Sequence, residues 1–188
     1  MKGILLLLFA FSSLSVASAD VLCHPPMSLT SFNEILWRTK DAYFPELKNE
    51  KIILKTFRSD AYFLQAQPEI KTLIGKRNLR VYSVQLNLKL LDCPPSNDAL
   101  EAILVHELEH VKDYTKWSAA KIAKHGFYYA SSLDFKKKYE RQTDKKTLEK
   151  GLHLGLAGYR DWVYQWLTPK DLKRKRFIYL TPEEILGH

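Results

Sequence analysis

The segment from Asp98 to Lys116 constrains the fold more than any other part of the chain, because nearly all positions of its first turns are apolar. Residues 93–97 read Cys-Pro-Pro-Ser-Asn, which breaks any preceding element, and Asn97 or Asp98 can cap a helix that starts there. A helix that is apolar on most of its faces is buried. We therefore expect a central helix over residues 98–116 that other elements surround.

This apolar helix carries the sequence His106-Glu107-Leu108-Glu109-His110, an H-E-x-x-H pattern. Histidines four positions apart stand on one helix face, so both rings can bind one metal ion. Glu107 lies beside that face, where its carboxylate can accept a proton from a water held by the metal. The alternative is a core helix whose histidines bond to buried carbonyls, although burying such polar groups without partners is costly.

A third metal ligand has to come from outside this motif. A catalytic zinc usually keeps three protein ligands and one open position for water, and residues 111–116 contain no histidine. Glu140 and Asp144 follow on a later predicted helix, one turn apart, so both carboxylates can face the motif. Asp113 shares the face of the two histidines and either supports one of them or is a solvated acid. We expect Zn²⁺, although two histidines and a carboxylate also suit other transition metals.

HExxH followed by ExxxD on a second helix resembles the gluzincin metallopeptidases, and the resemblance covers roughly residues 80–151. It implies that Glu107 is the general base and that Asp144 holds one histidine in the required tautomer. The zinc ligands that it implies are His106, His110 and Glu140.

The same resemblance gives a role to a predicted strand at residues 81–90. Apolar and polar side chains alternate there, which is typical of a half-buried strand. Gluzincins place an edge strand beside the cleft, so we expect this strand to be that edge. An extended peptide substrate could then add to the sheet through its backbone.

The remaining pattern predicts one helix-dominated α+β domain over residues 20–188, with a small sheet whose edge strand lies beside the HExxH helix. The length suits a single domain, and no repeat or Gly/Ser linker divides it. Further helices are predicted near residues 32–43, 131–150 and 152–167, and short ones start at Thr168-Pro169 and Thr181-Pro182. Strand candidates lie at residues 51–57 and 61–64.

Peptide hydrolysis also needs a donor for the oxyanion that develops on the substrate carbonyl. Related peptidases use a histidine, tyrosine or arginine placed after the third ligand. The candidates in this chain are His125, Tyr128, Tyr129, His153, Tyr159 and Arg160. We expect Arg160 to act, with His153 as the second choice, although each is more often a surface or packing residue.

Residues 1–19 have the three parts of a secretory signal peptide: the charged Lys2, an apolar run from Ile4 to Phe11, and Ala17-Ser18-Ala19 as the cleavage site. The apolar run is shorter than the roughly 20 residues that span a bilayer. We therefore expect a chain exported to the periplasm or the medium, with a mature start near Asp20 and no membrane span.

The two cysteines, Cys23 and Cys93, can form one disulfide in an exported chain. Two unpaired buried thiols are the alternative. A cysteine soon after the leader also fits a lipid-anchored protein, but Asp20-Val21-Leu22 before Cys23 fits that pattern poorly. The oxidising destination favours the disulfide.

The chain has a formal net charge of +8, with basic runs at residues 136–138, 145–146 and 170–176. Such runs are usually solvated helix faces. Anionic cell-envelope polymers are a candidate partner for them. Nucleic acid is not expected as a partner, because export removes the chain from it.

Together these features predict a zinc-dependent metallopeptidase that hydrolyses peptide or protein substrates in the cell envelope or outside the cell. The alternative is a non-catalytic, metal-containing envelope protein that binds anionic cell-wall polymer. A structural zinc is usually closed by four protein ligands, often cysteines. Both cysteines lie far from the motif in sequence, and Glu107 would have no purpose at such a site, so the enzyme is favoured.

Overall fold

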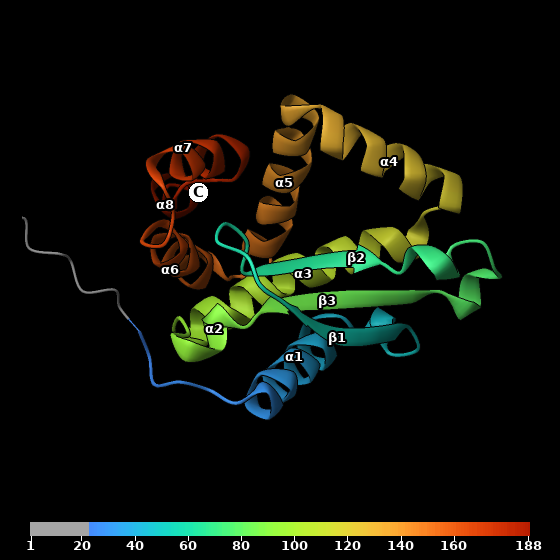
Figure 1. The fold of residues 1–188 in the computed structure, drawn as a ribbon, viewed down its shortest axis with the longest axis horizontal. Coiled ribbons are helices and arrows are strands. Elements are labelled where there is room, and N and C mark those ends of the chain that lie inside the picture. Colours follow the sequence, from blue (N-terminus) through green and yellow to red (C-terminus); the bar gives the residue numbers. More distant parts are fainter. Residues whose placement is uncertain (1–22) are drawn as a thin grey trace, which may run out of the picture.

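The computed structural model describes residues 23–188, so the predicted signal peptide at residues 1–19 and the mature start near Asp20 lie outside the described residues. The described part is helix-dominated with one small sheet, which confirms the α+β prediction (Figure 1). In chain order the elements are α1 (Leu29–Tyr43), β1 (Lys51–Phe57), β2 (Leu64–Pro68), β3 (Val81–Asn87), α2 (Lys89–Asp92), α3 (Asn97–Lys116), α4 (Ala119–Ser131), α5 (Leu133–Leu148), α6 (His153–Tyr164), α7 (Pro169–Ile178) and α8 (Pro182–Leu186). Short 3-10 turns lie at Pro45–Leu47, Ile70–Thr72 and Arg77–Leu79.

Helix α3 is the central element, packed against α1, α5, α6 and the sheet (Figure 1). Leu100, Leu104 and Leu108 on it are fully buried, as its apolar sequence predicts. Each such leucine stabilises the fold by roughly 2 kcal/mol through burial. The cap is Ser96, whose hydroxyl accepts the Ala99 N–H at 3.3 Å, so the helix is capped just before the predicted positions.

The three-stranded sheet has the order β1-β3-β2, with β1 parallel and β2 antiparallel to β3. The prediction that the alternating strand is the edge beside the cleft is therefore wrong, because β3 lies in the centre and β2 is an edge. The prediction of a half-buried strand is also wrong, since Ser83 and Asn87 between the apolar residues are fully buried. A strand with a neighbour on each side and covered faces has no solvated side.

Strand β3 ends at Asn87, three residues before the predicted end at residue 90. The Asn87 amide donates to the carbonyls of Ser59 and Tyr62 at 2.6 and 2.7 Å, and its side-chain oxygen accepts the Lys89 N–H at 3.1 Å. These bonds turn the chain into α2, so Leu88 and Leu90 belong to a helical turn and not to the strand. Leu90 is nonetheless fully buried.

Helix α4 is an element that the sequence pattern did not predict. Ser118 caps it by accepting the Lys121 N–H at 3.2 Å. Apolar or small residues do recur at helical spacing in it, but the fold buries Ile122 alone among its residues. It follows α3 in the chain, and its residues Ile122, Ala123 and Gly126 line a cavity together with β2.

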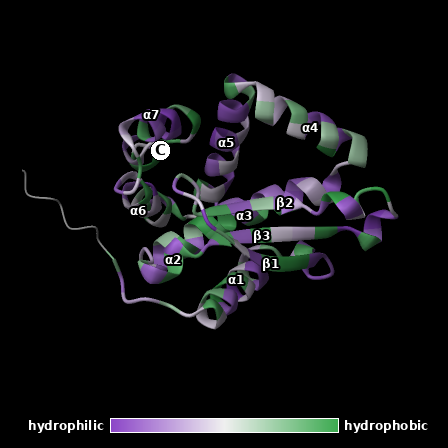
Figure 2. Ribbon diagram, viewed as in Figure 1, coloured by the Kyte–Doolittle hydropathy of each residue, from purple (hydrophilic) through white to green (hydrophobic). Residues whose placement is uncertain are grey.

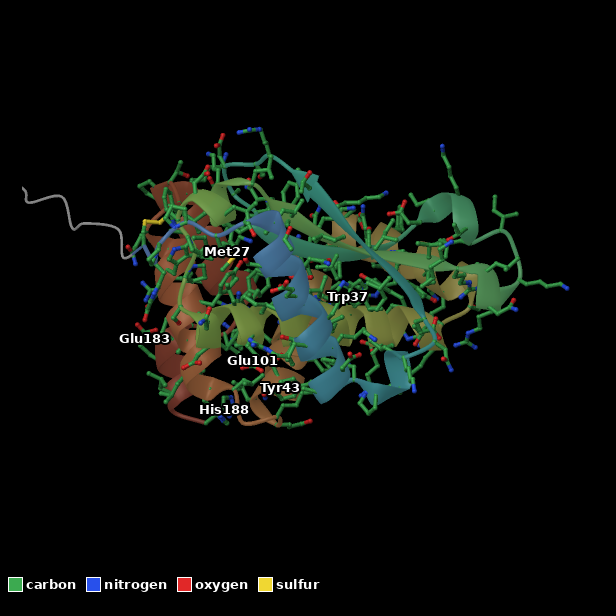
Figure 3. All side chains as sticks on the ribbon, turned by 90° about the horizontal axis from the view of Figure 1, so that it is seen from below. Met27, Trp37, Tyr43, Glu101, Glu183 and His188 are labelled. Carbon is green, nitrogen blue, oxygen red and sulfur yellow. A yellow bond between two sulfur atoms is a disulfide. The ribbon has the colours of Figure 1, made fainter. Side chains whose placement is uncertain are left out.

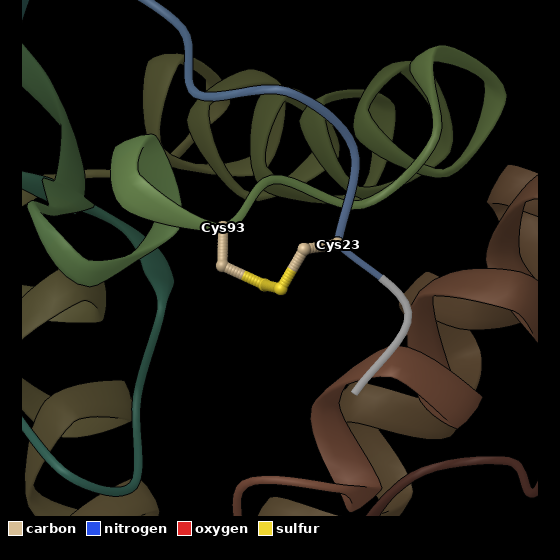
Figure 4. Close-up of a disulfide and its surroundings, with 2 residues drawn as sticks. All are labelled: Cys23 and Cys93. Carbon is tan, nitrogen blue, oxygen red and sulfur yellow. A yellow bond between two sulfur atoms is a disulfide. The ribbon is translucent and has the colours of Figure 1, made fainter. Parts of the chain in front are cut away.

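The N-terminal segment is attached to the domain by the Cys23–Cys93 disulfide, which confirms the predicted pairing (Figure 4). Beside it the His24 N–H donates to the Pro94 carbonyl at 3.0 Å. Helix α1 follows and starts at Leu29, earlier than predicted, because Ser28 caps it. Figure 3 shows Tyr43, at the far end of α1, beside Glu101 of α3.

Helix α6 approaches α3 closely at Gly155, where a Cβ atom would lie 2.3 Å from the Asp98 carbonyl oxygen. A glycine is therefore required for this packing. Farther along, Thr168 caps α7, and Thr181 forms a capping box with Glu184 at the start of α8, as the sequence predicts. These caps fix the C-terminal helices against α5 and α6.

Hydrophilic residues cover much of α5 and α7 (Figure 2), but the basic runs are not entirely solvated. Lys136 is only 8% exposed, because the helical period places it on the same face as the buried Glu140. The expectation of solvated lysine faces is therefore wrong for this residue. Among residues 23–188 no helix is long and apolar enough to cross a membrane.

Candidate metal centre

Helices α3 and α5 bring His106, His110 and Glu140 together in the core of the domain. The Nε2 atom of His106 lies 3.1 Å from Glu140 Oε2 and 3.2 Å from His110 Nε2. The third side, from His110 Nε2 to Glu140 Oε2, is 3.4 Å. All three side chains are buried. The structure therefore assembles the three residues predicted as ligands, with one potential ligand atom of each facing the others.

The chemistry of these three atoms fits a metal ion. Two imidazole nitrogens and a carboxylate oxygen are all electron-pair donors, and they cannot lie this close together without a proton or a cation between them. A tetrahedral zinc about 2.1 Å from each ligand would hold the ligand atoms about 3.4 Å apart. The observed distances of 3.1 to 3.4 Å are close to that spacing.

Behind the triad, Asp144 links the first histidine to a buried arginine. Its Oδ1 atom lies 2.9 Å from His106 Nδ1, although the angle departs from that of an ideal hydrogen bond. The same oxygen accepts from Arg160 Nη2 at 2.7 Å, and Oδ2 accepts the Leu180 N–H at 2.9 Å. Asp144 is thus placed to orient His106 through Nδ1 and leave Nε2 for a metal.

These carboxylates control the protonation of the metal-free site. Burial opposes a charge on His106, but Asp144 and Glu140 outweigh it and raise the pKa of His106 to about 9. Burial likewise opposes ionisation of Asp144, but Arg160 and His106 hold its pKa below the usual value. A metal ion at the triad would displace the His106 proton. Its positive charge would then replace that of the protonated ring beside Asp144 and Glu140.

The second histidine is held from the other side by Tyr139. The tyrosine hydroxyl lies 3.1 Å from His110 Nδ1 and 3.4 Å from Asp113 Oδ2. Asp113 also accepts from Lys146 Nζ at 3.0 Å. Asp113 therefore reaches the site through Tyr139 and is neither a direct partner of a histidine nor a free solvated acid.

The carboxylate of Glu140 divides its two oxygens between two partners. Oε2 faces the histidines, while Oε1 accepts a hydrogen bond from the Tyr129 hydroxyl. Burial opposes ionisation of Glu140, but His110 and His106 hold its pKa well below the usual value. Tyr129 was a candidate oxyanion donor from the sequence, and the structure places its hydroxyl on the ligand carboxylate.

A cavity of about 600 Å³ opens on the triad. Its wall includes Glu107, His110 and Glu140, together with the whole of β2 and part of α4. Burial raises the pKa of Glu107, and the two histidines oppose that rise. A carboxylate with a raised pKa at the wall of a cavity is suited to accept and return a proton.

The other oxyanion candidates fall in different places. Arg160 is buried, donates to Asp144 and lies over the Tyr179 ring at 4.4 Å, beside a hollow of about 20 Å³ that also touches His106 and Glu107. His125 lines the main cavity with its ring 4.3 Å from that of Tyr139. The remaining candidates are less suited by position: Tyr128 is 42% exposed, Tyr159 is buried in the main core, and His153 begins α6.

Three aromatic residues of the site were not anticipated from the sequence: Tyr114, Tyr139 and Tyr179. Tyr179 lines the main cavity, the hollow of about 20 Å³ and a further hollow of about 60 Å³. Its ring centre lies 6.1 Å from that of His106. It follows α7, far from the motif in sequence, so no spacing pattern points to it. Tyr139 could have been noticed because it directly precedes Glu140.

Comparison with known proteins does not assign a family. No family model matches the chain, and no curated protein or solved structure shows significant similarity to it.

Proposed function

We propose that this protein is a zinc-dependent metallopeptidase, a hydrolase of the gluzincin type. The observation that carries the proposal is that His106, His110 and Glu140 converge at a cavity whose wall also holds Glu107. A closed structural site would use a fourth protein ligand and would have no use for this adjacent carboxylate. The open cavity beside the triad therefore supports a catalytic site and not a closed structural one.

The sheet edge supports a peptide substrate. Within the described residues β2 pairs with β3 on one side only, and all five of its residues line the cavity. An extended chain laid along this edge could bond to the β2 backbone with little dependence on its side chains. The cleft role that we expected of residues 81–90 is therefore proposed for β2.

The residues of the chain divide the chemistry between them. When bound, zinc supplies a Lewis acid that polarises the substrate carbonyl and makes water more acidic. Glu107 accepts the proton of the attacking water and delivers it to the leaving amine. Asp144 and Tyr139 hold the two histidine rings in orientation, and Tyr129 holds Glu140.

The oxyanion donor is proposed to be Arg160 or a cavity residue nearer the substrate path. Arg160 already donates to Asp144, which leaves part of its guanidinium for the small hollow beside Glu107. Tyr179 and His125 both line the larger cavity and carry a donor. Replacing each of the three separately, and comparing kcat at unchanged metal content, identifies the donor.

Export of the protein is part of the same proposal. The Cys23–Cys93 disulfide fits an oxidising compartment, such as the periplasm or the medium. Peptide bonds of envelope or extracellular proteins would then be the substrates. Fractionation of cells that express the full chain, followed by N-terminal sequencing, tests both export and the cleavage after residue 19.

The decisive experiment measures metal content and peptide cleavage on the same purified samples. Wild type should hold an equivalent of zinc and cleave casein or a labelled peptide. Glu107→Gln should keep zinc and lose cleavage, whereas His110→Ala should lose both. Glu109→Gln is the matched control, because Glu109 is equally buried on α3 but is surrounded by Lys112, Lys146 and Lys150 away from the cavity.

Each outcome has a clear meaning. A wild type that binds no metal would refute the proposal. A wild type that binds zinc tightly but cleaves no peptide, with Glu107→Gln indistinguishable from it, would favour the non-catalytic envelope protein.

A further inference from the structure

Two lysines lie beside the metal site without a carboxylate partner. Lys136 is 8% exposed and lines the main cavity together with Glu107 and Glu140. Lys175 of α7 is half-buried and lines the hollow beside His106 and Glu107. No ion pair within 4.0 Å involves either ammonium group among residues 23–188.

Aromatic rings hold both ammonium groups in place. Lys136 Nζ lies 4.3 Å from the centre of the Tyr129 ring, and Lys175 Nζ lies 4.3 Å from that of Tyr62. Tyr62 also lies 5.7 Å from Lys136 Nζ, so one ring stands near both cations. Ring faces attract a cation, but they compensate only part of the hydration that a buried ammonium loses.

The two lysines border a common hollow of about 60 Å³ between Tyr62 and Tyr179. Arg174 adds a third cation to its wall. The one carboxylate in that wall is Asp171, which is already engaged by the Thr168 hydroxyl at 2.7 Å. The hollow is large enough for a carboxylate group, since a water molecule occupies about 30 Å³ of liquid.

The charges around the triad also favour an anionic ligand. Glu107, Glu140 and Asp144 balance three cations, namely Arg160, Lys136 and Lys175. A divalent ion at the triad would add two positive charges to this region, where burial already lowers the pKa of Lys136 and lowers that of Lys175 to about 7. Such a region attracts an anionic substrate group and repels a cationic one.

The path from these lysines to the triad is short. Lys136 precedes Glu140 by one turn of α5, and the Tyr129 ring beneath its ammonium group bonds to Glu140. Lys175 Nζ lies 5.0 Å from the centre of the Tyr179 ring, which in turn neighbours the His106 ring. These successive distances of 5.0 and 6.1 Å place Lys175 Nζ no farther from the His106 ring than about three residues of an extended substrate.

We propose that Lys136 and Lys175 form a carboxylate-binding subsite, so that the peptidase prefers substrates with a carboxylate within about three residues of the bond that it cleaves. This inference rests on the proposed function for the cleavage step, but the binding preference stands independently of it. The carboxylate could be a free C-terminus or the side chain of aspartate or glutamate, because both present the same group to a lysine.

The experiment compares four fluorescent peptides of one sequence, which end in a free acid or an amide and carry Glu or Gln within about three residues of the expected cleavage position. Binding is measured by fluorescence anisotropy to zinc-loaded Glu107→Gln, so that the substrate is not consumed, and kcat/KM is measured on wild type. A charge-assisted contact should favour the carboxylate peptide roughly tenfold or more. The peptide that binds more tightly shows whether the bound carboxylate is a C-terminus or a side chain.

Variants then assign the preference to the two lysines. Lys136→Met and Lys175→Met should each reduce the preference to near unity, while the Lys→Arg variants keep it, because Arg retains the charge. Lys138→Met and Lys173→Met are the controls, since both residues are exposed on the same two helices. Circular dichroism confirms that each variant is folded before it is compared.

The results separate the two proposals. Equal binding of all four peptides to zinc-loaded Glu107→Gln with both lysines intact would overturn the subsite, as would a preference that survives both Lys→Met changes. Selective binding that depends on the lysines, together with no cleavage of any peptide, would uphold the subsite and refute the peptidase.

Discussion

Replacing Asp144 with asparagine tests how far one buried carboxylate supports both the fold and the metal site. Asp144 is fully buried, pairs with Arg160 at 2.7 Å and lies 2.9 Å from His106 Nδ1. Asparagine has nearly the same shape but no charge. The change therefore leaves the Arg160 guanidinium buried without an anion, and it removes the carboxylate that orients His106.

The structure gives the expected size of both effects. Breaking a buried ion pair by removing one partner costs about 3–5 kcal/mol. For a chain of this length each 1 kcal/mol lowers Tm by about 2–4 °C, so Tm should fall by about 6–20 °C. Loss of a carboxylate behind a metal-binding histidine should weaken zinc affinity by roughly 10- to 100-fold.

The assay combines thermal unfolding by circular dichroism, on EDTA-treated protein, with zinc titration against a fluorescent chelator. Asp134→Asn is the matched control, because Asp134 is an exposed aspartate on the same helix. It should change neither property much. The double variant Asp144→Asn/Arg160→Met removes both charges, so it should recover part of the lost stability without recovering zinc affinity.

The reasoning would be refuted if Asp144→Asn unfolded within 2 °C of wild type and bound zinc with unchanged affinity. A loss of stability with unchanged affinity would show that Asp144 holds Arg160 but does not orient His106.

Three further predictions concern the disulfide, the helix packing and the pH dependence. Cys93→Ser should lower the free energy of unfolding by about 4 kcal/mol in urea titrations, because the Cys23–Cys93 bridge closes a loop 70 residues long; an unchanged midpoint would contradict this. Gly155→Ala should cost about 1–3 kcal/mol, since the new Cβ would meet the Asp98 carbonyl at 2.3 Å, whereas Gly126→Ala, with open space around it, should cost nothing. In metal-free protein, NMR titration should find a pKa of about 9 for His106. The protonated ring then stabilises the fold fully below about pH 6.5, and this contribution is lost as the pH rises through 9. A titration midpoint of His106 at or below pH 6.5 would show that the carboxylates do not offset burial.

The sequence by itself predicted the features that depend on neighbours along the chain. The HExxH histidines share a face of α3 because a helix repeats every 3.6 residues, wherever that helix lies. Likewise Glu140 and Asp144 share a face of α5. The caps at Thr168 and Thr181 involve residues only three positions apart, so they are local as well. With two cysteines only one pairing within the chain is possible, which made the disulfide predictable.

Only the tertiary structure decided which strand forms the edge. The alternating pattern of residues 81–87 is compatible with an edge or a centre position, because it records burial and not the number of neighbours. Pairing with β1 on one side and β2 on the other places β3 in the centre. The strand that lines the cavity is therefore β2, whose residues 64–68 also alternate between apolar and polar but do not indicate by themselves which edge they form.

The surroundings of the metal site were also decided by tertiary packing. Tyr179 and Lys175 come from α7 and its C-terminal cap, far from the motif in sequence, and reach the cavity because α7 packs on α5. Lys136 belongs to a lysine run that the sequence alone would leave in solvent. Its burial follows because α5 lines the cavity beside α3 and packs against α7. Contacts between segments distant in sequence leave no periodic signal in either segment.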